Sequence, residues 1–191
     1  MEAFDFDKTL TKKDTLFGFY KAVHGGGWRF ESKRLALLAF AVLYKLKVLS
    51  NTGLKKAGVW LFLKGTTQET IASCAERYAQ SVEWNALYHN HFLRLPASER
   101  VVVSASLEEY LLPLFPDNLV FGSQLRYRNG RVAGLQRNLY GAAKVALLKQ
   151  QGLDSFEAVY SDSMVDTPLF SLGKKTFRVE GDRVTEIEAG V

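Results

Sequence analysis

Three short apolar runs along the chain predict buried strands. Residues 3–6, 101–103 and 156–160 are dominated by β-branched and aromatic side chains, and each run ends at a polar residue. An apolar run without alternation is typical of a strand that is covered on both faces, as in a parallel sheet. Residues 14–95 show no strand-like alternation and are rich in Leu, Ala and Lys, so they predict several helices separated by Gly, Ser and Thr breaks.

The second half of the chain alternates between predicted strands and helices. Asn129 and Gly130 form the strongest short signal for a β-hairpin, and Gly152 follows a helix-like segment in the position of a C-cap. In chain order, the further predicted elements are a helix over residues 107–114, two strands within 119–132, a helix over 139–151, a short helix over 165–172, and a closing pair of strands over 176–179 and 183–187.

This order of elements predicts an α/β fold with a Rossmann-like, mostly parallel sheet, helices on both faces and an inserted helical cap. Residues 1–13 and 96–191 would form the α/β core, and residues 14–95 would form the cap. In such sheets, ligands bind at the carboxyl ends of the strands. The residues that directly follow the predicted strands are therefore the first candidates for a functional site.

The composition favours a cytoplasmic protein with its own core. Hydrophobic residues make up 47% of the chain, and the single cysteine, Cys74, excludes an internal disulfide. Asp5 and Asp7 do not fit the apolar region of a secretory signal. The longest apolar run, residues 35–44, is half of the roughly 20 residues that a membrane helix needs.

The net charge of +5 is concentrated in the predicted cap. Between Lys12 and Lys64 there are eleven Lys and Arg residues against Asp14 and Glu31. This asymmetry favours an anionic substrate or an anionic surface as partner, and a solvated lysine face is the alternative interpretation. Nucleic acid is not expected as a partner, because no known nucleic-acid-binding motif accompanies the lysines.

Polar side chains follow each of the three predicted buried strands. Asp5 and Asp7 end the first strand, Ser104 ends the second, and Asp162 and Asp166 follow the third. The carboxyl ends of neighbouring parallel strands meet at one edge of a sheet, so we expect these side chains to lie close together.

Such a cluster of carboxylates needs positive charge nearby. Asp5 and Asp7 would share one face of a strand, where two carboxylates repel unless a cation or a proton intervenes. If Asp7 holds a proton, one divalent metal ion and Lys144 would balance the charges of the other three aspartates. A set of oxygen ligands selects a hard ion, and Mg²⁺ is typically bound by one or two carboxylates together with a substrate phosphate.

Four stretches in this order resemble the motifs of the haloacid dehalogenase superfamily. Residues 4–11, with the pattern DxDxT, look like its first motif, and residues 101–104 are similar to its second, a hydrophobic strand ending in Ser or Thr. Lys144 within residues 141–145 resembles the third motif, and residues 160–169 resemble the fourth, DxxxD. The resemblance covers essentially the whole chain and implies a phosphatase.

The resemblance also implies roles for the protein's own residues. Asp5 would attack phosphorus and form an aspartyl-phosphate, which needs no base because a carboxylate is ordinarily ionised at neutral pH. Asp7 would protonate the leaving group and then accept a proton from the hydrolytic water. Ser104 and Lys144 would hold the phosphoryl oxygens, and Thr9 would assist them by orienting the first loop.

The implied cofactor is Mg²⁺. Its ligands would be Asp5, the backbone carbonyl of Asp7 and Asp162, with Asp166 as a further ligand or as the anchor of a bound water. Two positions depart from the motifs: Lys8 stands where Gly or Ser is usual, and Val165 stands where many members have Asn.

The position of the insertion, directly after the first motif, resembles the helical cap of the phosphoserine-phosphatase-like branch. This implies a small phosphorylated metabolite as substrate, with Asp14 near the position of the acidic residue that meets the substrate amine. A cap arginine would meet the substrate carboxylate, and Arg29, Arg34 and Arg77 are the candidates.

Two alternatives remain open at the level of sequence. The basic, aromatic cap and the fourth motif also resemble the C-type phosphatidylglycerophosphate phosphatases, which implies a lipid headgroup as substrate and peripheral contact with the inner face of an anionic membrane. Residues 35–44 would then lie in the interface, whereas otherwise they form the core helix of the cap. The other alternative is a non-catalytic basic module that binds membrane or nucleic acid, which would have no need of the carboxylates.

Four further polar residues are interpreted as structural. Ser106 is predicted as the N-cap of the helix that follows the second strand. His24, His89 and His91 are predicted as surface or capping residues, because His89 and His91 are two apart, a poor spacing for one helix face.

Overall fold

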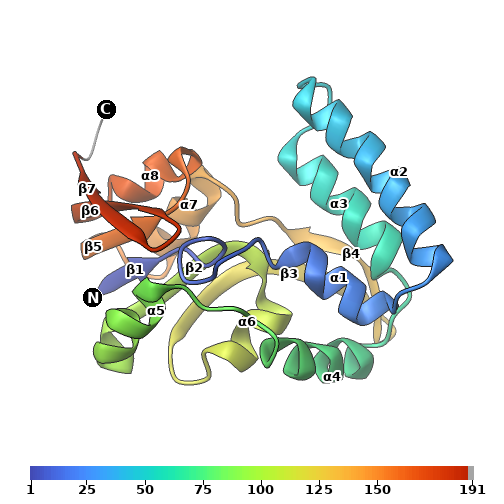
Figure 1. The fold of residues 1–191 in the computed structure, drawn as a ribbon, viewed down its shortest axis with the longest axis horizontal. Helices are drawn as coiled ribbons and strands as arrows, with labels where there is room; N and C mark the ends of the chain where they lie inside the picture. Colours follow the sequence, from blue (N-terminus) through green and yellow to red (C-terminus); the bar gives the residue numbers. More distant parts are fainter. Residues whose placement is uncertain (189–191) are drawn as a thin grey trace.

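Within residues 1–188, which a computed structural model describes, a seven-stranded sheet forms the centre of the molecule (Figure 1). The strand order is β4-β3-β2-β1-β5-β6-β7, parallel except that β4 and β7 pair antiparallel to their neighbours. The strands are β1 (Glu2–Phe4), β2 (Arg100–Leu107), β3 (Leu119–Arg128), β4 (Arg131–Arg137), β5 (Phe156–Ser161), β6 (Gly173–Glu180) and β7 (Arg183–Ile187).

The first strand lies at the middle of the sheet. Phe4 is in register with Val102 on one side and with Tyr160 on the other. The pairing continues for one more bond, because the backbone N–H of Asp5 donates to the Tyr160 carbonyl at 2.9 Å. The ends of β1, β2 and β5 therefore meet at one edge of the sheet, as the positions of the polar residues predicted.

Helices cover both faces of the sheet, which confirms the predicted fold class. One face packs against α5 (Ala86–Asn90) and α6 (Glu108–Leu114), and its core includes the fully buried Phe4, Phe92 and Tyr110. The other face packs against α7 (Ala142–Gln150) and α8 (Thr167–Phe170), around Ala3 and Leu148. The two faces of β1 thus belong to two separate apolar clusters, which explains why its short run is apolar throughout.

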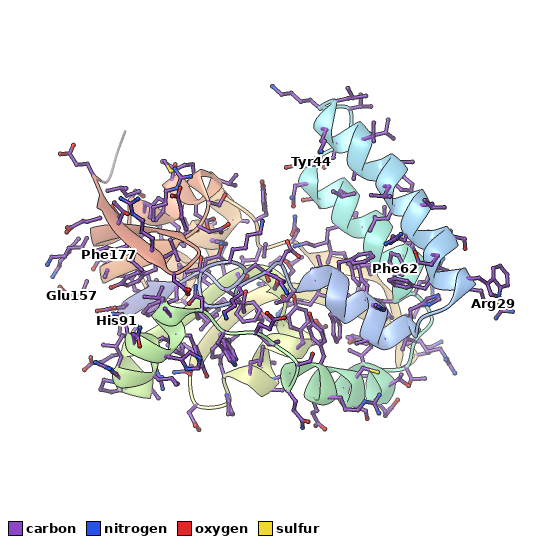
Figure 2. All side chains as sticks on the ribbon, viewed as in Figure 1. Arg29, Tyr44, Phe62, His91, Glu157 and Phe177 are labelled. Atoms are coloured by element: carbon purple, nitrogen blue, oxygen red, sulfur yellow. The ribbon has the colours of Figure 1, made fainter. Side chains whose placement is uncertain are left out.

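Besides α5, the predicted insertion contains four α-helices: α1 (Leu16–His24), α2 (Trp28–Lys45), α3 (Asn51–Phe62) and α4 (Gln68–Ala79). α2 and α3 form a hairpin that projects from the sheet, and α4 lies below α1 (Figure 1). The ring of Phe62 stacks on Tyr20 at 5.3 Å and contacts Phe17 and Phe30 at 6.1 and 5.2 Å, so one aromatic cluster joins three of the helices (Figure 2).

The link between α3 and α4 pairs with an edge strand of the sheet. The N–H of Gly65 donates to the Val132 carbonyl, and the N–H of Val132 donates to the Thr66 carbonyl, each at 2.9 Å. After α4 the chain returns to the first strand, where Phe92 packs edge-on against Phe4. Residues 83–95 therefore lie against the core, while the division into a core of 1–13 and 96–191 and a cap of 14–95 stays a prediction.

Several element boundaries differ from those predicted. β2 continues to Leu107, four residues beyond the valine run, and the predicted helix over 165–172 is a 3-10 turn (Met164–Asp166) followed by α8. α7 begins only at Ala142, because Gly141 before it has a positive φ of 57°. The predicted hairpin turn is confirmed: Asn129 and Gly130 both have positive φ, as a type I′ turn requires.

Within residues 1–188, no helix has both the length and the apolar character that crossing a bilayer requires.

The aromatic cluster of the insertion gives a prediction on stability. Phe62→Ala removes the ring shared by α1, α2 and α3, and we expect it to lower the free energy of unfolding by about 3 kcal/mol, because the surrounding rings cannot fully collapse onto the cavity. Urea denaturation followed by circular dichroism measures the change. Leu93→Ala, at a half-exposed position, is the control, and an effect of Phe62→Ala no larger than that of the control would contradict the prediction.

Candidate active site

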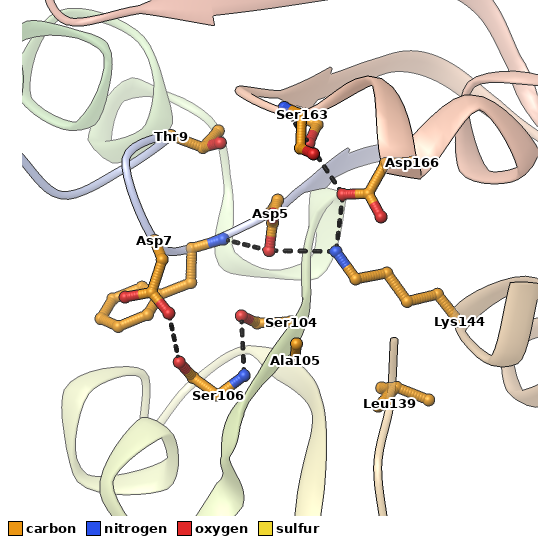
Figure 3. A network of polar contacts seen from close by, with 12 residues as sticks. Asp5, Asp7, Thr9, Ser104, Ala105, Ser106, Leu139, Lys144, Ser163 and Asp166 are labelled. Carbon is orange, nitrogen blue, oxygen red and sulfur yellow. Dashed lines mark hydrogen bonds and ion pairs between the residues drawn. The ribbon is translucent and has the colours of Figure 1, made fainter. Parts of the chain in front are cut away.

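Asp5 stands at the first position beyond β1, on the floor of a cavity. Its Oδ1 accepts a hydrogen bond from the N–H of Phe6 at 2.7 Å and lies 3.1 Å from Nζ of Lys144 (Figure 3). The residue is almost fully buried yet lines the cavity. Its side chain is therefore held in one orientation, with access only from the cavity.

Lys144, in the first turn of α7, lies between two carboxylates. Its Nζ is 2.7 Å from Oδ2 of Asp166 as well as 3.1 Å from Asp5 (Figure 3). Ser161 donates to the same Asp166 oxygen at 2.7 Å. Burial alone would lower the pKa of Lys144, but the charges of Asp5 and Asp166 outweigh it, so the pKa is raised above its ordinary value. The lysine therefore stays charged, which suits the predicted role of holding phosphoryl oxygens.

Asp7 is held by three hydrogen bonds at the entrance to the cap. Its Oδ1 accepts from the N–H and the hydroxyl of Thr15 at 2.8 and 2.6 Å, and its Oδ2 accepts from the hydroxyl of Ser106. Burial and the charge of Asp14 raise the pKa of Asp7 to about 7, although the bonds from Ser106 and Thr15 oppose the shift. A carboxyl group with this pKa exchanges its proton near neutral pH, as an acid-base catalyst must.

Asp162 and Asp166 complete the group of carboxylates. Burial, followed by the charge of Asp5, raises the pKa of each to about 6. The structure thus brings together the predicted aspartates at one edge of the sheet, where their like charges disfavour full ionisation.

Thr9 differs from the predicted phosphate-binding role. It is fully buried and is absent from the cavity lining, and its hydroxyl accepts a hydrogen bond from the N–H of Asp162 at 2.9 Å. Thr9 therefore ties the loop after β1 to the loop after β5, and this supports only the orienting part of its predicted role.

Ser106 was wrongly predicted as a helix cap. β2 extends through it, and α6 has no side-chain cap. Ser104 and Ser106 both line the cavity, because residues two apart on a strand share a face. The N–H of Ser106 donates to Oγ of Ser104 at 3.1 Å (Figure 3). The alternation Ser104-Ala105-Ser106 was the signal in the sequence that could have identified it.

The cavity has a volume of about 670 Å³ and lies between the strand ends and the insertion. Its floor is polar, whereas much of its wall on the insertion side is apolar. The floor consists of Asp5, Asp7, Ser104, Lys144, Asp162 and Asp166, and the apolar wall of Leu16, Phe17, Leu37, Leu38, Ala41 and Leu54.

Few charged residues of the insertion reach this cavity. Asp14, predicted near the substrate, lines it, and so does Arg34. Of the other two candidate arginines, Arg29 lies at the outer end of α2 (Figure 2), and neither Arg29 nor Arg77 is part of the lining. The structure therefore brings only Arg34 of the three towards the site.

Lys55 also lines the cavity, and nothing in the sequence singled it out. It is buried, although a lysine in an amphipathic helix normally lies on the surface. Burial, the largest effect, lowers its pKa to about 8.

The two departures from the first and fourth motifs lie at the cavity. Lys8 has a φ of 57°, the left-handed region that Gly adopts without strain, so its side chain is accommodated at a position where Gly would fit more easily. Val165 is partly exposed and also lines the cavity. The three histidines lie outside the lining, and His91, the C-cap of α5, pairs with Glu2 at 2.6 Å.

The donor set at the cavity floor consists of carboxylate oxygens, which suits a hard cation such as Mg²⁺. Within residues 1–188, no three His, Cys, Asp or Glu side chains are arranged to hold a metal by themselves. A magnesium ion would therefore take one or two of these carboxylates and complete its shell with backbone carbonyl, water and substrate oxygens, which is its usual arrangement in proteins.

A mostly parallel α/β sheet with a cluster of carboxylates at its strand ends is the usual place of a ligand site in α/β proteins. The chain belongs to the haloacid dehalogenase-like hydrolases, whose family model matches residues 3–171. The predicted superfamily is thereby confirmed, and membership of a hydrolase family speaks against the alternative of a non-catalytic binding module.

A curated relative is Protein CicA of Caulobacter vibrioides, which is 31% identical over 192 residues that cover 93% of this chain and 85% of the relative.

Among solved structures, a protein with unknown function from Bordetella pertussis Tohama I has a TM-score of 0.73 and 18% identity, covering 92% of this chain and 87% of its own. A phosphoserine phosphohydrolase-like protein from Francisella tularensis has a TM-score of 0.64 and 18% identity, covering 92% and 84%. A phospho-aspartyl intermediate analogue of phosphoserine phosphatase has a TM-score of 0.58 and 18% identity, covering 92% and 83%. These similarities confirm the predicted fold.

The raised pKa of Asp7 gives a prediction on stability. Its ordinary value is 3.8 and its value in the folded protein is about 7, so between these two pH values the folded state binds more protons than the unfolded state. The free energy of unfolding therefore falls as the pH rises through this range. In metal-free buffer, we expect the fall between pH 4 and pH 7 to be smaller in Asp7→Asn by roughly 2 to 4 kcal/mol.

Urea denaturation at a series of pH values measures this effect. Asp117→Asn, at an exposed position, serves as the control and should keep the wild-type slope. An equal pH dependence in wild type and Asp7→Asn would contradict the prediction.

Proposed function

We propose that the chain is a magnesium-dependent phosphomonoester hydrolase that works through an aspartyl-phosphate on Asp5. The observation that carries this proposal is the pairing of two differently held carboxylates on one cavity floor. Asp5 is fixed by Phe6 and Lys144, whereas Asp7 has a pKa of about 7. Two carboxylates with distinct environments are the pattern of a nucleophile and an acid-base group.

Asp5 supplies the nucleophile. Among the described residues, its hydrogen bond from Phe6 and its ion pair with Lys144 both go to Oδ1, so Oδ2 is left to attack phosphorus. The P–O bond to the leaving group breaks as the new P–O bond to Asp5 forms. Ser104 and the charged Lys144 would hold the phosphoryl oxygens, since phosphoryl transfer depends mainly on positioning and on compensation of charge.

Asp7 supplies the proton transfers. In its protonated form it gives a proton to the leaving alkoxide, and the resulting carboxylate then takes a proton from the water that hydrolyses the aspartyl-phosphate. The hydrogen bonds from Thr15 and Ser106 keep the carboxyl group turned to the cavity.

For the metal, Asp5, Asp162 and the backbone carbonyl of Asp7 would be the ligands. When bound, Mg²⁺ would supply positive charge to the phosphoryl oxygens. Asp166 would support the site through Lys144, with which it pairs at 2.7 Å.

One candidate substrate is a small phosphorylated metabolite such as phosphoserine. The phosphoserine phosphatases among the structural neighbours support this proposal. Asp14 and Arg34, which line the cavity on the side of the insertion, would then meet an amine and a carboxylate. The protein would work in the cytoplasm.

The second candidate is a lipid headgroup presented by an anionic membrane. Two observations favour it: the apolar wall of the cavity, and the exposed apolar side chains around the tip of the α2–α3 hairpin, including Leu43, Leu46 and Val48. Lys45 and Lys47 alternate with them. Apolar side chains mixed with lysines suit the boundary between headgroups and acyl chains. The enzyme would then lie on the inner face of the membrane.

The proposed mechanism predicts different effects of two substitutions. Asp5→Asn removes the nucleophile, so we expect the Mg²⁺-dependent kcat to fall roughly a thousandfold or more for every substrate. Asp7→Asn removes only the acid-base group, so it should reduce kcat/KM for alkyl phosphates such as phosphoserine or phosphatidylglycerophosphate far more than kcat/KM for p-nitrophenyl phosphate, whose leaving group needs no proton. The value of kcat should fall for both kinds of substrate, because Asp7 also assists hydrolysis of the shared aspartyl-phosphate.

Steady-state kinetics with and without Mg²⁺ measure both effects, and Asp117→Asn serves as the control. Turnover that survives Asp5→Asn would refute the aspartyl-phosphate mechanism. Equal losses of kcat/KM with both leaving groups in Asp7→Asn would refute its role as an acid.

The membrane proposal predicts binding to anionic vesicles. Wild-type protein should sediment with vesicles that contain phosphatidylglycerol, less so at high salt, and not with vesicles of phosphatidylcholine alone. Leu46→Glu together with Val48→Glu should reduce binding about tenfold or more, because two charges would enter the interface. Leu93→Glu, also at an exposed leucine, is the control. Absence of salt-sensitive binding by the wild type would leave the soluble metabolite as substrate.

A further inference from the structure

Lys55 lies on α3, within the insertion, but its ammonium reaches the sheet. Nζ donates to the carbonyl of Ala105, to Oδ1 of Asn138 at 2.7 Å and to Oγ of Ser123 at 3.3 Å. Among residues 1–188, no carboxylate lies within ion-pair distance of it. Lys55 is thus a buried cation whose three protons all go to neutral acceptors.

This arrangement is costly and therefore informative. Burial disfavours an ammonium that has no paired carboxylate, and the lowered pKa of Lys55 records this cost. The charged groups that act on it from the cavity are Asp5, Asp7 and Asp14, which favour its charge, and Lys144, which opposes it. A lysine that serves only solubility has no need to be buried, and Lys56 at the next position is exposed.

The Ala105 carbonyl lies in a part of β2 whose backbone is not regularly paired with β3. The register between β2 and β3 shifts between Val103 and Leu107, so the stretch from Ser104 to Ser106 lacks regular ladder pairing. The Ala105 carbonyl receives side-chain donors instead, from Lys55 and from Ser123 at 2.6 Å.

The peptide that carries this carbonyl also carries the N–H of Ser106. That N–H donates to Oγ of Ser104 at 3.1 Å, and the Ser106 hydroxyl donates to Asp7 (Figure 3). Because a peptide group is planar, a donor that fixes the Ala105 carbonyl also fixes the opposite N–H. Through this one peptide unit, Lys55 therefore acts on two residues: Ser104, which would hold phosphate, and Ser106, which donates to Asp7.

A second contact ties the same network to the start of α3. Nδ2 of Asn138, which follows β4, donates to Oδ1 of Asn51 at 2.9 Å and to Oγ1 of Thr52 at 3.0 Å. Lys55 and Asn138 thus join the insertion to the sheet through one connected set of hydrogen bonds. A shift of α3 away from the sheet would break this set.

We propose that Lys55 is a positioning residue through which the insertion sets the shape of the phosphate-holding stretch Ser104–Ser106. The proposal rests on the proposed phosphatase function for the meaning of that stretch. With α3 seated, the Ala105 peptide is fixed and Ser104 is in place for a phosphoryl oxygen. With α3 displaced, the peptide loses one of its two donors, so the affinity for phosphate depends on the placement of the insertion.

The test compares two neighbouring lysines. Lys55→Met removes the donor but keeps the length of the side chain, and Lys56→Met at the exposed neighbour is the matched control. We expect Lys55→Met to weaken the binding of inorganic phosphate, measured by calorimetry in the presence of Mg²⁺, about tenfold or more, and to lower kcat for p-nitrophenyl phosphate by a similar factor. Lys56→Met should match wild type in both.

Lys55→Gln separates the hydrogen bond from the charge. Its amide still donates, so an intermediate phosphate affinity is expected if positioning of the Ala105 peptide is the role. If Lys55→Met does not fold by circular dichroism, Asn138→Ala cuts the same network from its other side, and weaker phosphate binding is again expected.

Four results would overturn the proposal. One is phosphate affinity within twofold of wild type in folded Lys55→Met, or in Asn138→Ala where Lys55→Met does not fold. The second is a lower melting temperature alone, which would make Lys55 merely structural. The third is a loss that appears in KM for one substrate but not in phosphate affinity, which would make it a contact to the leaving group. The fourth is loss of turnover in Asp5→Asn together with wild-type turnover in Lys55→Met, which would refute this inference and leave the phosphatase function intact.

Discussion

A single buried ammonium allows like charges to gather at the centre of this molecule. Asp5 and Asp166 both lie within 3.1 Å of Nζ of Lys144, in surroundings where two unpaired carboxylates would repel strongly. The order of the strands makes this meeting unavoidable, because β1 lies between β2 and β5 and all three end at the same edge. The rest of the site depends on this balance: burial first, and then the charges of neighbouring carboxylates, still raise the pKa values of Asp7 and Asp162.

Much of this centre could be predicted from the sequence, because it follows from local rules. A short apolar run followed by Asp5 and Asp7 indicates a buried strand that ends in carboxylates, and the same logic leads to Asp162. The hairpin at Asn129 and Gly130 follows equally from backbone preferences, since both residues tolerate positive φ. These features depend on neighbours in the chain, so they survive without knowledge of the tertiary structure.

The residues that could not be predicted take their meaning from contacts between distant segments. Ser106 was predicted as a helix cap because the valine run suggested that β2 ends before it. The extent of β2 is set by its pairing with β3 and not by the valine run alone. Nothing in the sequence singled out Lys55, because its acceptors, such as Asn138, are far away in the sequence. The Thr9 hydroxyl accepts a hydrogen bond from the loop after β5 and does not line the cavity. In each case the local sequence is compatible with several roles for the polar side chain, and only the tertiary structure selects one of them.

The two hydrogen bonds from Thr15 to Asp7 give the entrance of the insertion a consequence for the timing of proton transfer. Thr15 is the residue directly before α1, so any swing of that helix changes the distance of its N–H and hydroxyl from the carboxylate. These bonds favour the charged form of Asp7. A helix that swings out would, however, also expose the carboxyl group to water, and burial is the largest of the effects that raise its pKa. Asp7 would thus keep its proton near neutral pH only while the helix is in place.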